Sequence, residues 1–305
     1  MPKYQCHRKE CNRIRSEFSI FLNRRRPPQY EGKVFCSDAC LQRHFESELS
    51  EKWRRLQLEQ DRKIPRPKLG TILMQTAFIT RDQLNEAIKL QTQTREGRIG
   101  EWLLRLGFVE EHQITAALAQ QYGLPLINLN NSDANVDAVR MIPGKVAKCS
   151  GLVPVGFDDS QTALRIAVTA PVNFHSQEAI RRMVRKGIVA YIGDQSAIQR
   201  FLEQLYEPED LDLSNVPTFS SLEDLMEAGN KIIASAINNR AQDIRAELVQ
   251  DFFWIRLDFP TESHHHLFRY VAAPIHKQDQ MPENKIAVNY GIGNGDAIFS
   301  HPSGQ

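Results

Sequence analysis

Hydrophobic residues recur at helical spacing in the middle of the chain, and this pattern occurs twice. The segment KLGTILMQTAFITRDQLNEAIKLQ (68–91) aligns with RIGEWLLRLGFVEEHQITAALAQQ (98–121) at an offset of 30 residues. Each copy predicts a short helix, a tight turn and a longer helix. Thr80 and Gln83 fit a capping box at the start of the longer helix in the first copy. We therefore expect two helical hairpins that pack together with pseudo-two-fold symmetry.

Strand patterns alternate with helical ones in the rest of the chain. After the repeat, the sequence predicts strands at 152–157, 163–169 and 188–193 and helices at 174–186 and 195–206. It then predicts a helix at 220–240 and strands at 246–250, 252–259 and 267–275. Ahead of the repeat, residues 38–62 predict one charge-rich helix. We expect the tail to be poorly ordered, apart from a strand at 286–290.

The amino-acid composition excludes several classes of protein. The chain has 305 residues, 41% of them hydrophobic and 25% charged, which excludes a wholly disordered, collagenous or fibrous chain. The net charge of +1 gives no global sign of nucleic-acid binding. The sequence lacks an apolar run of the roughly 18–20 residues that span a bilayer, and it does not begin with a signal peptide. We expect a cytoplasmic protein without membrane insertion.

Four of the five cysteines form two close pairs near the N-terminus, Cys6 with Cys11 and Cys36 with Cys40. Two such pairs joined by a loop supply the tetrahedral ligand set that Zn²⁺ prefers. The segment KVFCSDACLQRH resembles the second knuckle of treble-clef fingers. We expect a structural zinc site, in which His7 or His44 could replace one thiolate. The alternative is a group of unrelated buried thiols in a basic arm.

Core packing explains most of the matched apolar positions of the repeat. It does not explain why a basic residue, an apolar residue and Gly begin both copies, or why Gln ends both. This pattern resembles the MshE-type N-terminal domain of type II secretion and type IV pilus assembly ATPases. The resemblance implies that the repeat binds cyclic di-GMP, with half of the dinucleotide on each copy.

The resemblance implies a set of nucleotide-binding positions in each copy. In the first copy these are Lys68, Leu69, Gly70, Leu73, Leu84, Ile88 and Gln91. In the second copy they are Arg98, Ile99, Gly100, Leu103, Ile114, Leu118 and Gln121. The first copy departs further from the family pattern, because Lys68 replaces Arg and Ala77 replaces the turn Gly. Lysine lacks the planar fork that arginine offers to phosphate or guanine.

The resemblance extends beyond the repeat. Residues 125–206 look like the remainder of the secretion-ATPase N-terminal domain, and 230–259 is similar to the start of the ATPase proper. A Walker A loop, G-x4-G-K-[S/T], is absent from the sequence, so we expect no ATP hydrolysis by this chain and no enzyme activity. The adjacent histidines His264, His265 and His266 are expected in a solvated loop rather than at a metal.

Together these patterns predict an α+β multidomain fold: a small zinc finger, a helical two-repeat domain fused to a small α/β domain, and a C-terminal α+β remnant. The expected boundaries are a finger at 1–48, a helical linker at 49–66, the repeat at 67–125, the α/β unit at 126–207, a linker at 208–218, the α+β segment at 219–276 and the tail at 277–305.

The predicted function is that of a non-enzymatic regulator or adaptor. Its expected ligand is cyclic di-GMP, and its expected protein partner is a component of a secretion or pilus motor. One alternative is a zinc-finger nucleic-acid-binding protein that contacts phosphates through Arg24, Arg25 and Arg26. Another is a protein-interaction scaffold that kept the fold without the ligand.

Overall fold

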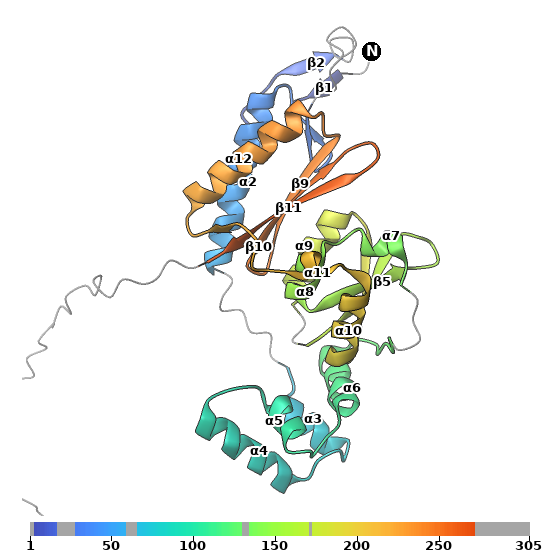
Figure 1. The fold of residues 1–305 in the computed structure, drawn as a ribbon. Helices are drawn as coiled ribbons and strands as arrows, with labels where there is room; N and C mark the ends of the chain where they lie inside the picture. The colour runs from blue at the N-terminus through green and yellow to red at the C-terminus, as the bar shows by residue number, and fades with distance from the viewer. Residues whose placement is uncertain (1–2, 17–27, 59–65, 130–133, 171–172, 272–305) are drawn as a thin grey trace, which may run out of the picture. The chain divides into compact units, whose positions relative to one another are not determined.

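The computed structural model describes residues 3–16, 28–58, 66–129, 134–170 and 173–271 (Figure 1). The predicted strand at 286–290, the end of the predicted helix 38–62 and the arginines at 24–26 lie outside these residues. None of the helices in the described part combines the length and apolar character needed to cross a membrane.

The N-terminal finger consists of two small hairpins followed by a long helix. The hairpins pair β1 (Lys3–Gln5) with β2 (Ile14–Ser16) and β3 (Gln29–Tyr30) with β4 (Lys33–Val34). Helix α2 (Asp38–Leu58) begins where the Ser37 hydroxyl accepts a hydrogen bond from the Cys40 amide at 3.3 Å. Such a side chain satisfies one of the amide groups that the first turn leaves unpaired.

The repeat forms four helices: α3 (Leu69–Gln75), α4 (Arg81–Thr94), α5 (Ile99–Arg105) and α6 (Glu111–Tyr122). The short helix of each copy packs against the long helix of the other, α3 on α6 and α5 on α4. The predicted capping box of Thr80 and Gln83 is confirmed. This reciprocal packing buries Ile72, Leu73, Leu103 and Val109 in one core.

The α/β unit contains a three-stranded sheet in the order β5 (Leu152–Phe157), β6 (Ala163–Val168), β7 (Gly187–Ile192). Strand β6 pairs antiparallel with β5 and parallel with β7. The crossover between β6 and β7 contains α9 (Phe174–Val184), and α10 (Gln195–Leu205) follows β7. Shorter helices are α7 (Val136–Val139), α8 (Gly144–Ser150) and α11 (Pro208–Leu211).

The C-terminal segment is a four-stranded sheet in the order β8 (Thr218–Phe219), β11 (Ser263–Tyr270), β10 (Phe252–Asp258), β9 (Asp243–Val249), with α12 (Leu222–Asn238) before β9. Two strands begin earlier than predicted. The expectation of a loop for His264, His265 and His266 is wrong, because these residues lie within β11. They pair across to Leu257, Arg256 and Ile255 of β10.

The finger and the C-terminal segment share one hydrophobic core. Buried residues of the finger, among them Tyr30 and Phe45, cluster with Phe253 and Ile255 of β10. Figure 1 shows α2 beside α12, and the two helices are in contact. The predicted α+β multidomain fold is confirmed, with the first and last described parts of the chain joined in one core.

Candidate metal centre and nucleotide-binding repeat

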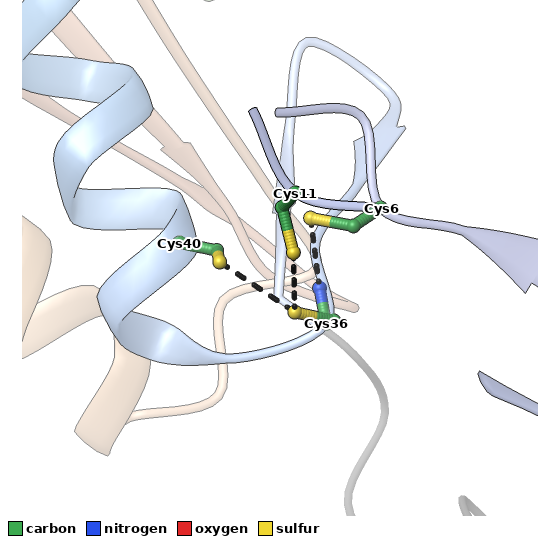
Figure 2. Close-up of side chains that lie close together, drawn as sticks. All are labelled: Cys6, Cys11, Cys36 and Cys40. Carbon is green, nitrogen blue, oxygen red and sulfur yellow. Dashed lines mark hydrogen bonds between the residues drawn. The ribbon is translucent and has the colours of Figure 1, made fainter. Parts of the chain in front are cut away.

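Two loops and the start of α2 bring the four N-terminal cysteines together (Figure 2). Cys6 follows β1, and Cys11 lies in the same loop ahead of β2. Cys36 lies between β4 and α2, and Cys40 is in the first turn of α2. Their four Sγ atoms all lie within 4.8 Å of one another, and Figure 2 shows the side chains pointing toward one another.

The sulfur spacing fits a tetrahedral metal site. Zinc bound at about 2.3 Å from each of four thiolates places the sulfurs roughly 3.8 Å apart. The Sγ atom of Cys36 lies 3.6 Å from that of Cys11 and 3.5 Å from that of Cys40. The Cys36 amide also donates to the Cys6 sulfur at 3.5 Å, which holds the two loops together at the cluster. These four cysteines could therefore hold a metal ion.

The local environment affects the thiols unequally. A hydrogen bond from the Arg13 backbone lowers the pKa of the Cys11 thiol to about 7. Burial raises the pKa of the Cys36 thiol to about 12. A bound cation deprotonates its coordinating thiols, so it would offset the cost of placing a thiolate at the buried position.

The two histidines considered as replacement ligands lie outside the cysteine cluster. The His44 ring lies 4.9 Å from the Phe35 ring and 5.6 Å from the Tyr30 ring, between centroids. Burial lowers the pKa of His44, so its neutral form is favoured. Within the described residues, the group of side chains placed to hold a metal consists of the four thiols.

The fourteen predicted nucleotide-binding residues separate by burial. Six lie in the core of the repeat: Gly70, Leu73, Leu84, Gly100, Leu103 and Ile114. Five are partly exposed: Leu69, Gln91, Ile99, Leu118 and Gln121. Three are exposed: Lys68, Ile88 and Arg98. The core residues are therefore closed to solvent, whereas the exposed and partly exposed ones are accessible from outside the repeat.

The glycines of the two copies have a packing role. A Cβ atom at Gly70 would lie 2.7 Å from a methyl group of Leu84, closer than real Cβ contacts come. A Cβ atom at Gly100 would lie 3.3 Å from a methyl group of Leu69 and 3.6 Å from Ile114. Close approach of the helices therefore explains the glycine that both copies share.

The glutamines that end the copies form equivalent hydrogen bonds. The Gln91 side-chain amide donates to the carbonyl of Gly97 at 3.0 Å, just before Arg98. The Gln121 side-chain amide donates to the carbonyl of Pro67 at 2.5 Å, just before Lys68. Each long helix thus fixes the backbone that leads into the basic residue of the other copy.

Arg98 connects the repeat to the α/β unit. It is the residue before α5, and its guanidinium donates to the Ala170 carbonyl at 3.1 Å. It also lines a cavity of about 740 Å³. Other polar residues on the cavity wall include Glu101, Lys148, Thr169, Gln195, Gln199 and Glu203. Of the fourteen predicted residues, Arg98 is the one that lines this cavity.

The sequence predicted neither this wall nor the ring contacts of Arg66. The guanidinium of Arg66 lies 4.4 Å from the centroid of the Tyr122 ring and 5.6 Å from that of Phe174. The sequence around Arg66 reads as a proline-containing linker, so it carries no signal of these contacts. Lys148 and Gln195 likewise belong to no motif and come together only through the fold.

Comparisons with known proteins find similarity that includes the α/β unit. Residues 122–211 match the MshEN domain family. The chain is 26% identical over 211 residues to the type IV pilus assembly ATPase PilB of Myxococcus xanthus, covering 62% of this chain and 37% of that protein. It is 22% identical over 158 residues to PilB of Thermus thermophilus, covering 52% and 18%. The matched part of the chain thus spans between about a fifth and two fifths of the length of these two relatives.

Two solved structures also resemble this chain. One is MshE with cdg, at 30% identity and a TM-score of 0.41, covering 46% of this chain and 100% of that one. The other is the N-terminal domain of XpsE, at 22% identity and a TM-score of 0.37, covering 47% and 99%. The predicted resemblance to the MshE-type domain is confirmed by the family match, whose residues follow those of the repeat.

Proposed function

We propose that this chain is a non-catalytic regulator or adaptor that binds cyclic di-GMP through its two-repeat unit. The observation that carries the proposal is Arg98, an exposed residue that lines a cavity shared by the repeat and the α/β unit. Arginine offers a planar pair of donors to phosphate oxygens or to guanine O6 and N7. A cavity of about 740 Å³ lies in the range of small-ligand sites.

The two copies would contribute unequally to the ligand. Lys68 stands at the position of Arg98 but presents a compact ammonium rather than a fork. The cavity that Arg98 lines also holds Lys148, Gln195 and Gln199 from the α/β unit. We therefore expect the second copy and this polar wall to supply most of the affinity.

The same proposal assigns a structural zinc ion to Cys6, Cys11, Cys36 and Cys40, supported by their sulfur spacing. Zinc would supply no chemistry beyond holding the two loops and α2 together. Ligand binding would fix the angle between the repeat and the α/β unit and so change the surface offered to a protein partner. The proposed partner is a component of a secretion or pilus motor.

Titration calorimetry with cyclic di-GMP tests the nucleotide site. The wild type should bind, and Arg98→Ala should bind about 10–100-fold more weakly, as the loss of a charged hydrogen bond predicts. Gln199→Ala should also weaken binding if the cavity is the site. Arg81→Ala removes an exposed arginine elsewhere in the repeat and serves as the matched control. Absence of binding by the wild type would reject the nucleotide proposal.

The scaffold alternative has its own support. The shared glycines allow close helix packing, and the shared glutamines hydrogen-bond the backbone. These roles account for the repeat pattern without a ligand. A wild type that binds no nucleotide but captures a secretion or pilus motor component would favour this alternative. Steeply salt-dependent binding to DNA or RNA would favour the nucleic-acid alternative.

Metal analysis tests the zinc site separately. The purified wild type should carry one zinc ion per chain, and Cys36→Ser should lose it. Cys149→Ser is the matched control, because Cys149 lies outside the cluster. Zinc retained in Cys36→Ser would reject the assignment.

A further inference from the structure

The finger shares a hydrophobic core with the C-terminal segment and is not a separate module. Tyr30 and Phe35 are fully buried, and Phe45 and Leu49 of α2 are 1% exposed. They belong to the same core as residues of β9, β10 and α12. A finger that acted as a separate module would keep these apolar residues within its own small fold. Here they cover the sheet of the C-terminal segment.

The backbone of the finger also joins the edge of this sheet. Strand β9 is the last strand in the sheet order. The Glu31 amide, in the turn between β3 and β4, donates to the Ile244 carbonyl of β9 at 2.8 Å. The neighbouring Gly32 amide donates to the Asp243 carboxylate at 2.8 Å. The hairpin therefore satisfies backbone and side-chain acceptors that an exposed sheet edge would present.

Helices α2 and α12 approach closely at a glycine. A Cβ atom at Gly229 would lie 2.8 Å from the Phe45 ring, so this position tolerates no side chain without a shift of the ring. Beside it, the Asn230 side chain donates to Glu46 at 3.0 Å. The fit is specific to these two helices, although their residues lie far apart in the sequence.

A buried carboxylate connects the finger, the sheet and the α/β unit. Glu247 of β9 is 5% exposed. It accepts from Lys52 of α2 at 3.1 Å and from Arg182 of α9 at 2.7 Å. A displacement of α2 would take Lys52 away from Glu247 and leave this carboxylate paired with Arg182 alone.

We propose that zinc acts as a clasp for the C-terminal α+β segment. This inference rests on the zinc site proposed above. The four cysteines fix both hairpins and the first turn of α2, and the same elements complete the core over β9 and β10. A region as short as the finger cannot hold a large core by itself, so metal binding contributes directly to its folding. Loss of zinc therefore exposes the apolar face of the C-terminal sheet.

Hydrogen exchange on the full chain tests the clasp. Removal of zinc with a chelator should accelerate exchange in β9, β10 and α12 by about a hundredfold or more, as the loss of large core side chains predicts. Amides of α4, in the separate core of the repeat, should be unchanged and provide the internal reference. Unchanged exchange in β9 and β10 after zinc removal would overturn the proposal.

A second variant separates the clasp from the metal. Gly229→Ala touches no thiol but should accelerate the same exchange, because its methyl group displaces Phe45 from the interface. Glu227→Ala, on an exposed position of α12, should leave exchange unchanged. Zinc content is measured in every sample, so a wild type without zinc rejects the metal site. If the Gly229→Ala variant carries zinc but exchanges at the wild-type rate, the clasp proposal is rejected and the zinc site is retained.

Discussion

Ala77 and Gly107 occupy equivalent turns of the two copies and share the same left-handed backbone conformation. Their φ angles are 57° and 68°. Glycine adopts this region freely, whereas a residue with a Cβ atom pays about 1–2 kcal/mol. The fold of the first copy therefore retains a turn that its sequence no longer favours. The departure of Ala77 from the family pattern costs stability but leaves the turn in place.

Ala77→Gly should consequently stabilise the repeat. Relief of the left-handed strain exceeds the extra chain entropy of glycine, so we expect a gain of about 0.5–1 kcal/mol. The free energy of opening, measured by hydrogen exchange of α3 and α4 amides, reports this gain.

Gly107→Ala provides the reciprocal control. A Cβ atom there meets no atom within 4 Å, so only backbone conformation is changed. We expect a loss of about 1–2 kcal/mol. Equal effects of the same sign from both variants would contradict the assignment of strain.

Gln91→Ala and Gln121→Ala should each lower the stability of the ligand-free repeat. Each removes a hydrogen bond that fixes the other copy, worth about 0.5–1 kcal/mol at an exposed position. Gln93→Ala, on an exposed position of α4, is the matched control. Wild-type stability combined with weaker cyclic di-GMP binding would instead show that the glutamines act only on the ligand.

Glu247→Gln should strongly destabilise the C-terminal sheet. The carboxylate is buried between Lys52 and Arg182, and removal of one partner of a buried ion pair costs about 3–5 kcal/mol. Glu227→Gln breaks an exposed pair with Lys231 and should cost less than about 1 kcal/mol. Hydrogen exchange of the β9 amides measures the stability of both variants. Similar small losses of stability in the two would show that Glu247 contributes little.

Local sequence patterns predicted much of the fold. The helices of the repeat follow from apolar residues at helical spacing, and Thr80 with Gln83 correctly marks the start of α4. The pairing of Cys6 with Cys11 and of Cys36 with Cys40 indicated a metal site, and their sulfurs do converge. These signals lie within short segments, where spacing alone determines which side chains share a face.

Long-range burial could not be predicted in the same way. Asp243, Arg245 and Glu247 alternate with apolar residues in β9. From the sequence alone, such charged residues predict a loop or a solvent-exposed face. In the structure all three are buried and paired with opposite charges. Glu247 pairs with Arg182 of α9, Asp243 pairs with Arg185 just after α9, and Arg245 pairs with Asp243 and Asp258. The first predicted strand of this sheet therefore began too late, at 246 instead of 243.

The histidine run of β11 should make the stability of the chain sensitive to acid. His265 is partly buried in the sheet, and its Nδ1 atom accepts a hydrogen bond from the Trp254 indole at 3.0 Å. Burial, reinforced by Arg256 and Arg245, lowers the pKa of His265 from 6.5 to about 3. Below pH 6.5 the unfolded chain binds a proton that the folded chain refuses, so stability falls as the pH drops from 6.5 toward 3. At pH 5 the loss should be about 2 kcal/mol.

His265→Gln removes this titration and should flatten the pH dependence between 6.5 and 3. His264→Gln, at the exposed neighbouring position, should retain the wild-type slope. Other groups titrate in the same range, so the difference between the two variants isolates His265 from them. Urea unfolding followed by tryptophan fluorescence at pH 7.5 and pH 5 measures the effect. Parallel pH profiles for the wild type and His265→Gln would show that folding does not lower the pKa of His265.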